Sequence, residues 1–344
     1  MKELHFAVFG TGFWSHFQIP AWFEVGGVKI TALYNRTVSK AERVALEFSL
    51  NDAHVYADPE ELLRHEKLDF IDIITEIDAH APLVYLAAKH KIPVICQKPM
   101  APDLATAESM VKSCREAGVP FFIHENFRWQ TPIRAVKQVL AEGQIEKPFR
   151  AHISFVTAFP VFKNQPFLKT LEHLIITDLG SHMLDIARFL FGEATRLYCQ
   201  MNRVHNDIRG EDAATIMLEV GDQTTVVINM AYAESPLEHD YFPQTTIFIE
   251  GDNGSIELAP DYWLRVTTRE GTCARRVAPP RYAWADPDYD VVHSSIVPCN
   301  ADLLKQLKGE GRAETTAEDN LKTVRLVFAA YDSASTGKSI SFTR

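Results

Sequence analysis

The sequence predicts an α/β protein with two parts. The N-terminal part is a Rossmann-type, doubly wound parallel sheet, and the C-terminal part is an α+β domain with a large, mostly antiparallel open sheet. Strand and helix patterns alternate over residues 1–124, which is typical of a parallel sheet covered by helices. Several strands joined by short turns lie within residues 201–258, as in an antiparallel sheet. Because 344 residues exceed a typical single core, we expect two domains, 1–124 and 125–344.

The first strand leads directly into a glycine-rich turn. Residues 4–9 are mostly apolar, and residues 10–15 read Gly-Thr-Gly-Phe-Trp-Ser before a helix. Such a turn binds a pyrophosphate, because one glycine allows the sharp bend and the next lacks the Cβ that would hold phosphates away. Alone, the pattern is also typical of an ordinary turn. We predict contacts to a dinucleotide from Gly10, Thr11, Gly12, Phe13 and Trp14.

The second strand, residues 28–35, ends where a nucleotide ribose is usually contacted. An acidic residue there favours the 2′-hydroxyl of NAD, but this chain has Asn35 followed by Arg36. A guanidinium stacks on a base or pairs with a phosphate, so Arg36 favours NADP slightly and leaves NAD open. The alternative is a polar strand end with a solvated arginine.

The rest of the first domain continues the alternation. The apolar run 68–75 is expected of a strand covered on both faces. Residues 39–42 read as a capping box, and Pro59 stands at the first position of a helix. We expect further helices over 80–90 and 103–118, and strands over 92–97 and 121–124.

Lys98 follows the strand 92–97 at its carboxyl end, the edge where open α/β sheets bind ligands. Pro99 restricts Lys98 to an extended backbone, which fixes where its ammonium group points. Taken alone, a lysine in a loop is more often a solvated surface charge.

A second polar group lies on a predicted helix in residues 177–192. Asp178, His182 and Asp185 stand at spacings that place them on one helical face. A carboxylate one turn from an imidazole raises its basicity and fixes its tautomer. The alternative is a helix with a polar face and one satisfied histidine.

The remaining elements of the second domain are predicted mainly from alternation and capping patterns. We expect helices over 132–143, 301–308 and from the capping box 315–318 to 335, strands over 150–159, 201–204, 214–220, 224–232 and 245–250, a turn and strand over 251–258, and a loop over 282–292. His293 after that loop is a candidate for substrate contact, although a histidine in a loop more often has no such role. An exposed apolar sheet face is covered when two copies pair, so we expect a homodimer or homotetramer.

Composition excludes several classes of protein. The net charge is −10 with no basic run, which argues against a nucleic-acid partner. No apolar run reaches the roughly 20 residues needed to span a membrane, and the start shows no signal-peptide pattern. Five cysteines are scattered without a C-x-x-C motif, as expected of reduced thiols in a cytoplasmic protein.

Three motifs together resemble one enzyme family. The glycine turn, Thr75 with His80 five residues later, and Gln97-Lys98-Pro99 are similar to the glucose–fructose oxidoreductase and inositol dehydrogenase (Gfo/Idh/MocA) family. Its hallmark segment is Glu-Lys-Pro, so Gln97 is a departure, and Glu76 stands where the family usually has proline. The resemblance implies that Thr75, His80, Gln97 and Lys98 contact the cofactor, in addition to Asn35 and Arg36 at the end of the second strand.

The resemblance also implies the catalytic residues. Family members carry Asp-x-x-x-His on the helix near 178, so Lys98, Asp178 and His182 become the catalytic set. Asn126 and Arg128 join these three residues as expected substrate contacts. The implied activity is an NAD- or NADP-dependent oxidoreductase, moving hydride between a nicotinamide and a hydroxyl or carbonyl carbon of a sugar, polyol or sugar-acid derivative.

Two other functions stay open at this point. One is an NAD-dependent glycosidase that oxidises its substrate transiently, and the other is a non-catalytic nucleotide-binding sensor. A metal centre formed by His173, Asp178 and His182 is conceivable, but hydride transfer with an acid/base pair needs no metal, so we expect none. Whether Lys98 or His182 takes the substrate proton is also open.

Overall fold

The computed structural model describes residues 3–221, 224–234 and 239–342, and the chain divides into two compact units. Unit 1 comprises the described residues of Met1–Asn126, Ala283–Ala285 and His293–Val324. Unit 2 comprises those of Phe127–Tyr282, Asp286–Val292 and Arg325–Arg344. The segment 293–324, which the sequence analysis placed after the domain boundary at 124/125, therefore packs with the N-terminal sheet.

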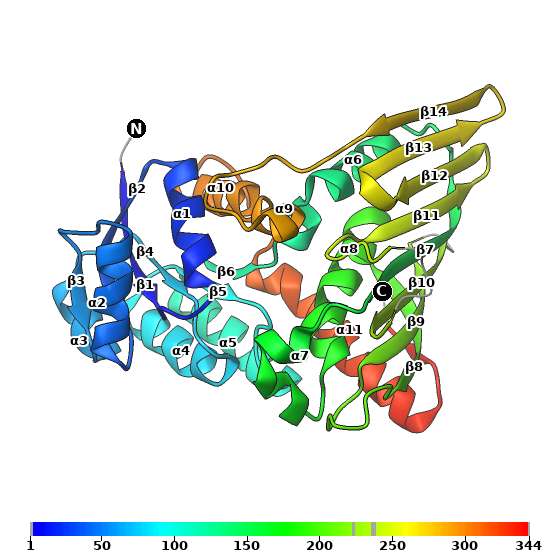
Figure 1. Cartoon of the computed structure of the whole chain (residues 1–344). Coiled ribbons are helices and arrows are strands. Elements are labelled where there is room, and N and C mark those ends of the chain that lie inside the picture. The colour runs from blue at the N-terminus through cyan, green and yellow to red at the C-terminus, as the bar shows by residue number, and fades with distance from the viewer. Residues whose placement is uncertain (1–2, 222–223, 235–238, 343–344) are drawn as a thin grey trace. The chain divides into compact units, whose positions relative to one another are not determined.

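Unit 1 is built on a six-stranded parallel sheet in the order β3-β2-β1-β4-β5-β6 (Figure 1). Every residue of β4, β5 and β6 is buried, because helices cover both faces of such a sheet. The predicted doubly wound sheet is confirmed. Its strands are β1 (Leu4–Phe9), β2 (Val28–Tyr34), β3 (His54–Tyr56), β4 (Phe70–Ile73), β5 (Val94–Gln97) and β6 (Phe121–His124).

The helices of unit 1 connect these strands, and one comes from far along the chain. Helix α10 packs against α1, a long-range contact that local sequence patterns do not show. The predicted capping box at 39–42 is wrong, because the helix begins at Val38 and Ser39 already lies inside it. The helices are α1 (Ser15–Val25), α2 (Val38–Glu47), α3 (Pro59–His65), α4 (His80–His90), α5 (Leu104–Ala117) and α10 (Ile296–Leu307).

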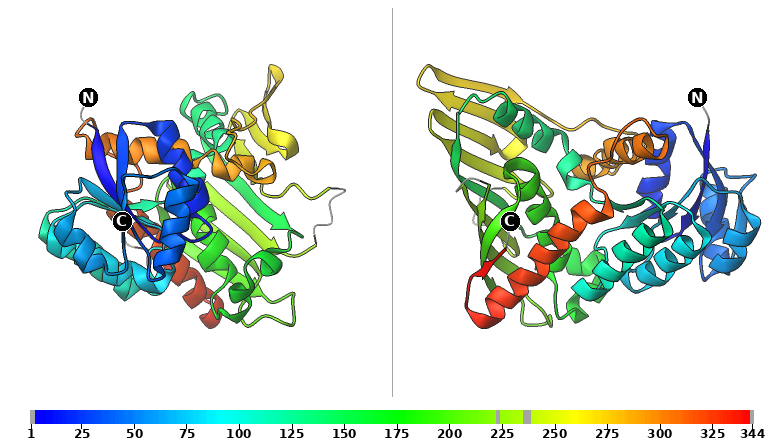
Figure 2. Two further views of the ribbon diagram at one scale, coloured as in Figure 1. Left: turned by 60° about the vertical axis from the view of Figure 1, so that its left-hand side comes forward. Right: turned by 180° about the vertical axis from the view of Figure 1, so that it is seen from behind.

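Unit 2 is built on a nine-stranded sheet in the order β14-β13-β12-β11-β7-β10-β9-β8-β15 (Figure 2). All neighbours are antiparallel except β7 and β10, so the predicted mostly antiparallel sheet is confirmed. The hairpin β13–β14 was not predicted. The strands are β7 (Pro148–Thr157), β8 (Ala194–Asn202), β9 (Ala213–Val220), β10 (Thr224–Tyr232), β11 (Thr246–Gly251), β12 (Gly254–Ala259), β13 (Trp263–Thr268), β14 (Gly271–Arg276) and β15 (Ile340–Ser341).

Helices α6 and α8 pack on one face of this sheet, and Figures 1 and 2 show them there. The long helix α11 begins one residue later than predicted, because the Thr316 hydroxyl, not that of Thr315, accepts a hydrogen bond from the Asp319 N–H at 3.3 Å. The predicted loop 282–292 also contains the start of a short helix. The helices wholly within unit 2 are α6 (Thr131–Ala141), α7 (Val161–Asn164) and α8 (Ser181–Phe191). Helices α9 (Asp290–His293) and α11 (Ala317–Thr336) have residues in both units.

The other face of the unit 2 sheet is partly exposed. Met217 pairs with Val227, Val227 with His152, and His152 with Phe248, so these four side chains form one row across β9, β10, β7 and β11. Met217 is 48% exposed and Phe248 is 41% exposed. The alternate residues Ile153, Ile216, Ile228 and Ile249 are fully buried or nearly so on the opposite face.

None of the described helices is both long enough and apolar enough to cross a membrane. All five cysteines are free thiols, and only Cys273 is exposed.

Candidate functional site

The glycine turn after β1 requires glycine at its first position. Gly10 has a φ of +102°, a backbone conformation that other residues rarely adopt. A Cβ at Gly10 would lie 2.6 Å from the carbonyl oxygen of Ile74 at the end of β4. The turn therefore packs directly against the chain that follows the neighbouring strand β4, a constraint beyond the sharp bend that the sequence analysis expected of Gly10.

The second glycine and the third small residue have different roles. A Cβ built on Gly12 would meet no atom within 4 Å, so space is left beside the backbone at this position. Ser15 is fully buried, and its hydroxyl donates to the Gly12 carbonyl at 2.6 Å. The serine thus ties the first turn of α1 to the glycine turn, which explains why it replaces glycine or alanine here.

Polar atoms without hydrogen-bond partners gather around the same turn. The Thr11 hydroxyl, the Trp14 indole N–H and the Thr75 hydroxyl are buried, and none has a partner among the described residues. Buried polar groups are normally satisfied, so each of these needs an explanation. The first turn of α1, residues 15–18, carries no acidic side chain. A dinucleotide phosphate fits this donor set and the positive end of the helix.

The residues at the end of β2 are arranged differently. The Asn35 side-chain amide donates to the Thr37 carbonyl at 2.9 Å, and its backbone N–H donates to the Tyr56 carbonyl at 3.2 Å. Arg36 is exposed. Asn35 therefore shapes the turn, and Arg36 is the accessible side chain of the pair.

His80 joins two loops at the carboxyl edge of the unit 1 sheet. Its Nδ1 lies 3.1 Å from the Pro99 carbonyl oxygen, and its Nε2 lies 3.1 Å from that of Thr75. The residue is only 1% exposed. Burial lowers the pKa of His80, while its contacts with these carbonyls oppose that change. His80 thus connects the loop of Thr75 to the loop of Lys98.

Lys98 is half-buried at the end of β5. Its backbone N–H donates to the side-chain oxygen of the preceding Gln97 at 3.3 Å. Gln97 is buried, and its amide nitrogen donates to the side-chain oxygen of Gln18 on α1. The lysine is therefore placed by a buried network as well as by its proline neighbour.

Asn126 ends unit 1 and is 3% exposed. Its amide nitrogen donates to the Ser295 hydroxyl at 2.7 Å. Nearby, His124 Nε2 lies 2.9 Å from the side-chain oxygen of Asn300. These contacts join β6 to the segment 293–324, a pairing that sequence reasoning missed.

In unit 2, Asp178 lies in a π-helical turn, Ile176–Gly180, immediately before α8. The predicted single α-helix through 178, 182 and 185 is therefore wrong at its first turn, because the π turn changes the angular spacing. The Asp178 carboxylate accepts a hydrogen bond from the Tyr232 hydroxyl at 2.9 Å. Burial and the neighbouring Asp178 raise the pKa of Tyr232 well above its usual range, so it remains a donor. Sequence reasoning missed this tyrosine, although it closes a strand with clear alternation.

His182 is 4% exposed in the first turn of α8. Its ring stacks on Phe127, with centroids 3.7 Å apart and planes 5° from parallel. The stacking holds the imidazole plane in a fixed orientation.

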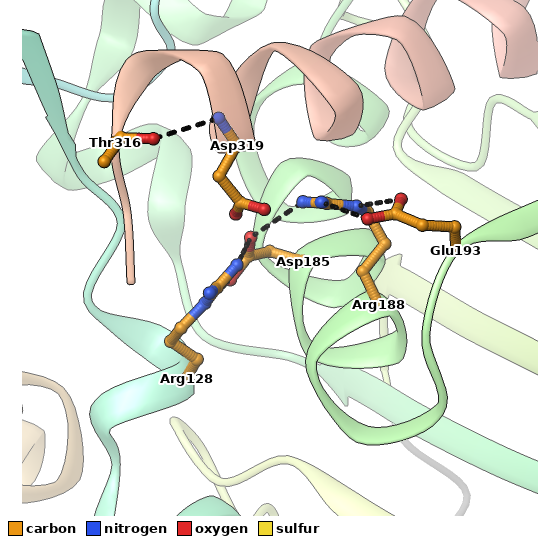
Figure 3. A network of polar contacts seen from close by, with 6 residues as sticks. All are labelled: Arg128, Asp185, Arg188, Glu193, Thr316 and Asp319. Atoms are coloured by element: carbon orange, nitrogen blue, oxygen red, sulfur yellow. Dashed lines mark hydrogen bonds and ion pairs between the residues drawn. The ribbon is translucent and has the colours of Figure 1, made fainter. Parts of the chain in front are cut away.

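Asp185 lies in a network of ion pairs with two arginines (Figure 3). It forms a two-point ion pair with Arg128, at 2.7 Å to Nε and 2.6 Å to Nη2. Arg188 lies 3.8 Å from the same carboxylate and also bonds Glu193 at 3.0 Å. The one-face grouping of Asp178, His182 and Asp185 is thus corrected. The Arg128 guanidinium, a predicted substrate contact, is directed to Asp185.

Among the described residues, no group of three or more His, Cys, Asp or Glu side chains is arranged to hold a metal ion. His173, which the sequence analysis considered, stacks on Tyr331 with ring centroids 4.0 Å apart.

Comparison with known proteins identifies the family. Residues 4–125 match the model of an oxidoreductase family with an NAD-binding Rossmann fold. Residues 133–257 match the GFO/IDH/MocA C-terminal domain. The chain belongs to the Gfo/Idh/MocA oxidoreductase family. The predicted family and the predicted class of enzyme, an oxidoreductase, are confirmed.

Similar proteins cover nearly the whole chain. A D-apiose dehydrogenase of Paraburkholderia graminis is 41% identical over 99% of this chain and 90% of its own length. Another from Rhizobium rhizogenes is 40% identical over 99% of this chain and 98% of its own length. An oxidoreductase from Agrobacterium radiobacter, solved with NAD+, L-tartaric acid and magnesium, has a TM-score of 0.95 at 39% identity, covering 99% of this chain and 98% of that one.

Proposed function

We propose that this protein is an NAD(P)-dependent dehydrogenase of D-apiose or a closely similar sugar. One observation carries the proposal: a chain about 40% identical to D-apiose dehydrogenases throughout its length carries the three residues of the expected catalytic set, Lys98, Asp178 and His182. The buried polar atoms without partners around the glycine turn support the proposal that the protein binds a nicotinamide dinucleotide there. A carbohydrate substrate agrees with the sugar, polyol or sugar acid inferred from sequence.

The proposed mechanism divides the work between the two units. A dinucleotide held at the glycine turn by its pyrophosphate would supply a nicotinamide as the hydride acceptor. His182 takes the proton of the substrate hydroxyl, and its stacking on Phe127 holds the ring in place for this transfer. Asp178 orients the imidazole and is itself held by Tyr232. The Lys98 ammonium stabilises the negative charge that develops on the substrate oxygen.

The proposed cofactor contacts are the residues of the glycine turn, the end of β2 and the two loops that His80 joins. We propose that both nucleotides are accepted. The NAD+ complex of the 39% identical neighbour supports NAD, and the exposed guanidinium of Arg36 supports binding of the NADP 2′-phosphate.

The test of the proposed function is a panel of sugars, polyols, sugar acids and glycosides. The absorbance of reduced nicotinamide would be followed with NAD+ and NADP+, and in the reverse direction with the oxidised sugars. We expect turnover with D-apiose above that with linear aldopentoses. Release of free sugar without net cofactor change would indicate a glycosidase instead, and tight nucleotide binding without any turnover would indicate a sensor.

We also propose that two or four copies associate through the outer face of the unit 2 sheet. Met217, Val227 and Phe248 are the apolar members of the row described above, and Met217 and Phe248 are exposed. Pairing two such faces would remove these side chains from water. Light scattering should show an oligomer for the wild type and a monomer for Met217→Glu. The matched control is Leu46→Glu, which changes a 78% exposed leucine in unit 1. A monomeric wild type would contradict the proposal.

The proposed location is the cytoplasm. Four of the five free thiols are buried, and free cysteines are the norm in reducing compartments. Fractionation of cells producing the protein would test this location.

A further inference from the structure

A buried carboxylate lies in the middle of the unit 1 sheet, in a strand that is otherwise apolar. Asp72 is fully buried in β4, between Ile71 and Ile73. Burying an ionised carboxylate is costly unless hydrogen bonds replace the lost water. The catalytic proposal above assigns no role to Asp72, so its presence requires a separate explanation.

The donors to this carboxylate are neutral side chains of α1. Gln18 Nε2 lies 2.8 and 2.7 Å from the two carboxylate oxygens, and Trp22 Nε1 lies 2.8 Å from one of them. Gln18 is itself fully buried. An indole N–H only donates, and an ionised carboxylate only accepts, so the hydrogen bonds from Trp22 and Gln18 both run towards Asp72.

This fixed direction extends to Lys98. Because the Gln18 amide nitrogen donates to Asp72, its oxygen faces Gln97 and accepts from the Gln97 amide nitrogen. The Gln97 oxygen is then turned to the backbone N–H of Lys98. Each amide is oriented by the one before it, starting from the only charged member, Asp72.

We propose that Asp72 and Gln18 are positioning residues for Lys98, acting through Gln97 by a hydrogen-bond relay of one fixed direction. The relay ends on the peptide nitrogen of Lys98, so it sets the backbone from which the ammonium group projects. This inference rests on the proposed function for the catalytic role of Lys98. The relay itself is a property of unit 1.

The direction of the relay predicts what happens when the negative charge is added at position 97 or removed from position 72. In Gln97→Glu, a carboxylate would face the Gln18 oxygen, and rotating the Gln18 amide would turn that oxygen towards Asp72. Both arrangements place acceptor against acceptor. In Asp72→Asn, two arrangements are available. If the relay keeps its direction, an amide N–H at position 72 or of Gln18 has no acceptor. If the relay reverses, the Gln97 amide nitrogen, a donor, faces the backbone N–H of Lys98, which is also a donor.

The double variant Asp72→Asn/Gln97→Glu again places a donor against an acceptor at every link of the relay. Gln18 would donate to Glu at position 97 and accept from Asn at position 72, while Trp22 would still donate to the Asn oxygen. The relay would run in the opposite direction, and the new carboxylate would accept from the Lys98 N–H. The two changes should therefore compensate each other.

The experiment compares the wild type, both single variants and the double variant by three measurements. These are the melting temperature, kcat and KM with D-apiose and NAD+, and the rate at which acetic anhydride acetylates Lys98, read by peptide mass spectrometry against the exposed Lys112. The matched control is Gln306→Glu, where the side-chain oxygen accepts from the Ala313 N–H and a carboxylate would do the same.

Each single variant should melt about 4 °C or more below the wild type, because a buried polar group loses its partner. kcat should fall roughly tenfold or more with KM little changed, since Lys98 is displaced. Lys98 acetylation should change while Lys112 does not. The double variant should recover on all three measurements, and Gln306→Glu should match the wild type.

Two results would overturn the relay. In the first, the losses measured in the two single variants add together in the double variant instead of cancelling. In the second, the single variants melt at a lower temperature, but their Lys98 acetylation rate and kcat equal those of the wild type. If the wild type turns over no sugar, the proposed function fails, but melting and acetylation still decide whether the relay positions Lys98.

Discussion

The two units stabilise a buried carboxylate in opposite ways. Asp72 in unit 1 and Asp185 in unit 2 are both fully buried. Asp72 accepts only from neutral donors, Gln18 and Trp22, and burial raises its pKa to about 6 although these hydrogen bonds oppose the change. Asp185 is paired with the guanidinium of Arg128 and lies near that of Arg188. In unit 1 the Asp72 carboxylate is thus stabilised by the dipoles of neutral N–H donors. In unit 2 the Asp185 carboxylate is stabilised by positively charged guanidinium groups.

The largest effect should come from removing the proposed catalytic group of either unit. His182→Ala and Lys98→Ala should each lower kcat by about 10²–10⁴, the range for a positioned acid/base group. Calorimetric affinity for NAD+ should change little in His182→Ala, since that residue belongs to unit 2. Full turnover in either variant would refute its role.

Breaking the charged pair in unit 2 should cost stability. Arg128→Ala leaves Asp185 without its two-point partner, which typically destabilises a protein by about 3–5 kcal/mol. Chemical denaturation would measure the loss. Arg150→Ala is the matched control, because Arg150 forms a similar pair with Glu250 but is exposed, and exposed pairs contribute little. Equal losses in both variants would contradict the contrast between buried and exposed pairs.

The neutral environment of Asp72 should appear as a pH dependence. Between about pH 4 and 6 the folded protein keeps a proton on Asp72 that the unfolded chain has lost. The free energy of unfolding should therefore fall as pH rises through this window, by up to about 1.4 kcal/mol per pH unit from this group. The Cys96 thiol nearby stays neutral because burial raises its pKa.

Asp72→Asn should lack this contribution. The difference in unfolding free energy between the wild type and the variant should thus shift in favour of the variant by up to about 3 kcal/mol from pH 4 to 6. Denaturation curves at several pH values would measure it. Parallel pH profiles for the two proteins would show that Asp72 does not titrate in this range.

The smallest effect should be at Arg36, which is exposed at the end of β2. Arg36→Ala should lower kcat/KM for NADP+ by about tenfold, the loss of one exposed charge-assisted contact, and leave NAD+ nearly unchanged. An equal change for both nucleotides would show that Arg36 does not contact the 2′-phosphate.

Patterns that depend on neighbouring residues were readable from sequence. The glycine turn, the parallel strands and Lys98 at the end of β5 follow from local spacing and apolar runs. The partners of the buried polar groups could not be predicted from sequence, because Gln18 and Trp22 are 54 and 50 residues away from Asp72 along the chain. Asp72 stood inside the predicted apolar run 68–75 without any sign of its donors.

The second unit shows the same limit. Nothing local indicates a π turn at Ile176–Gly180, which fits the chain to its surroundings. Tyr232 reaches Asp178 only because β10 and the π turn are brought together by the fold. In contrast, the hairpin β13–β14 carried readable signals, alternation of apolar and polar residues in 264–267 and a glycine at 271.

The most direct measurement is the initial rate of NADH formation from D-apiose by the wild type and by His182→Asn. The account predicts steady turnover by the wild type and a loss of about 10² or more in the variant, with the NAD+ dissociation constant unchanged. No NADH from D-apiose or any related sugar, despite tight binding of NAD+, would contradict it.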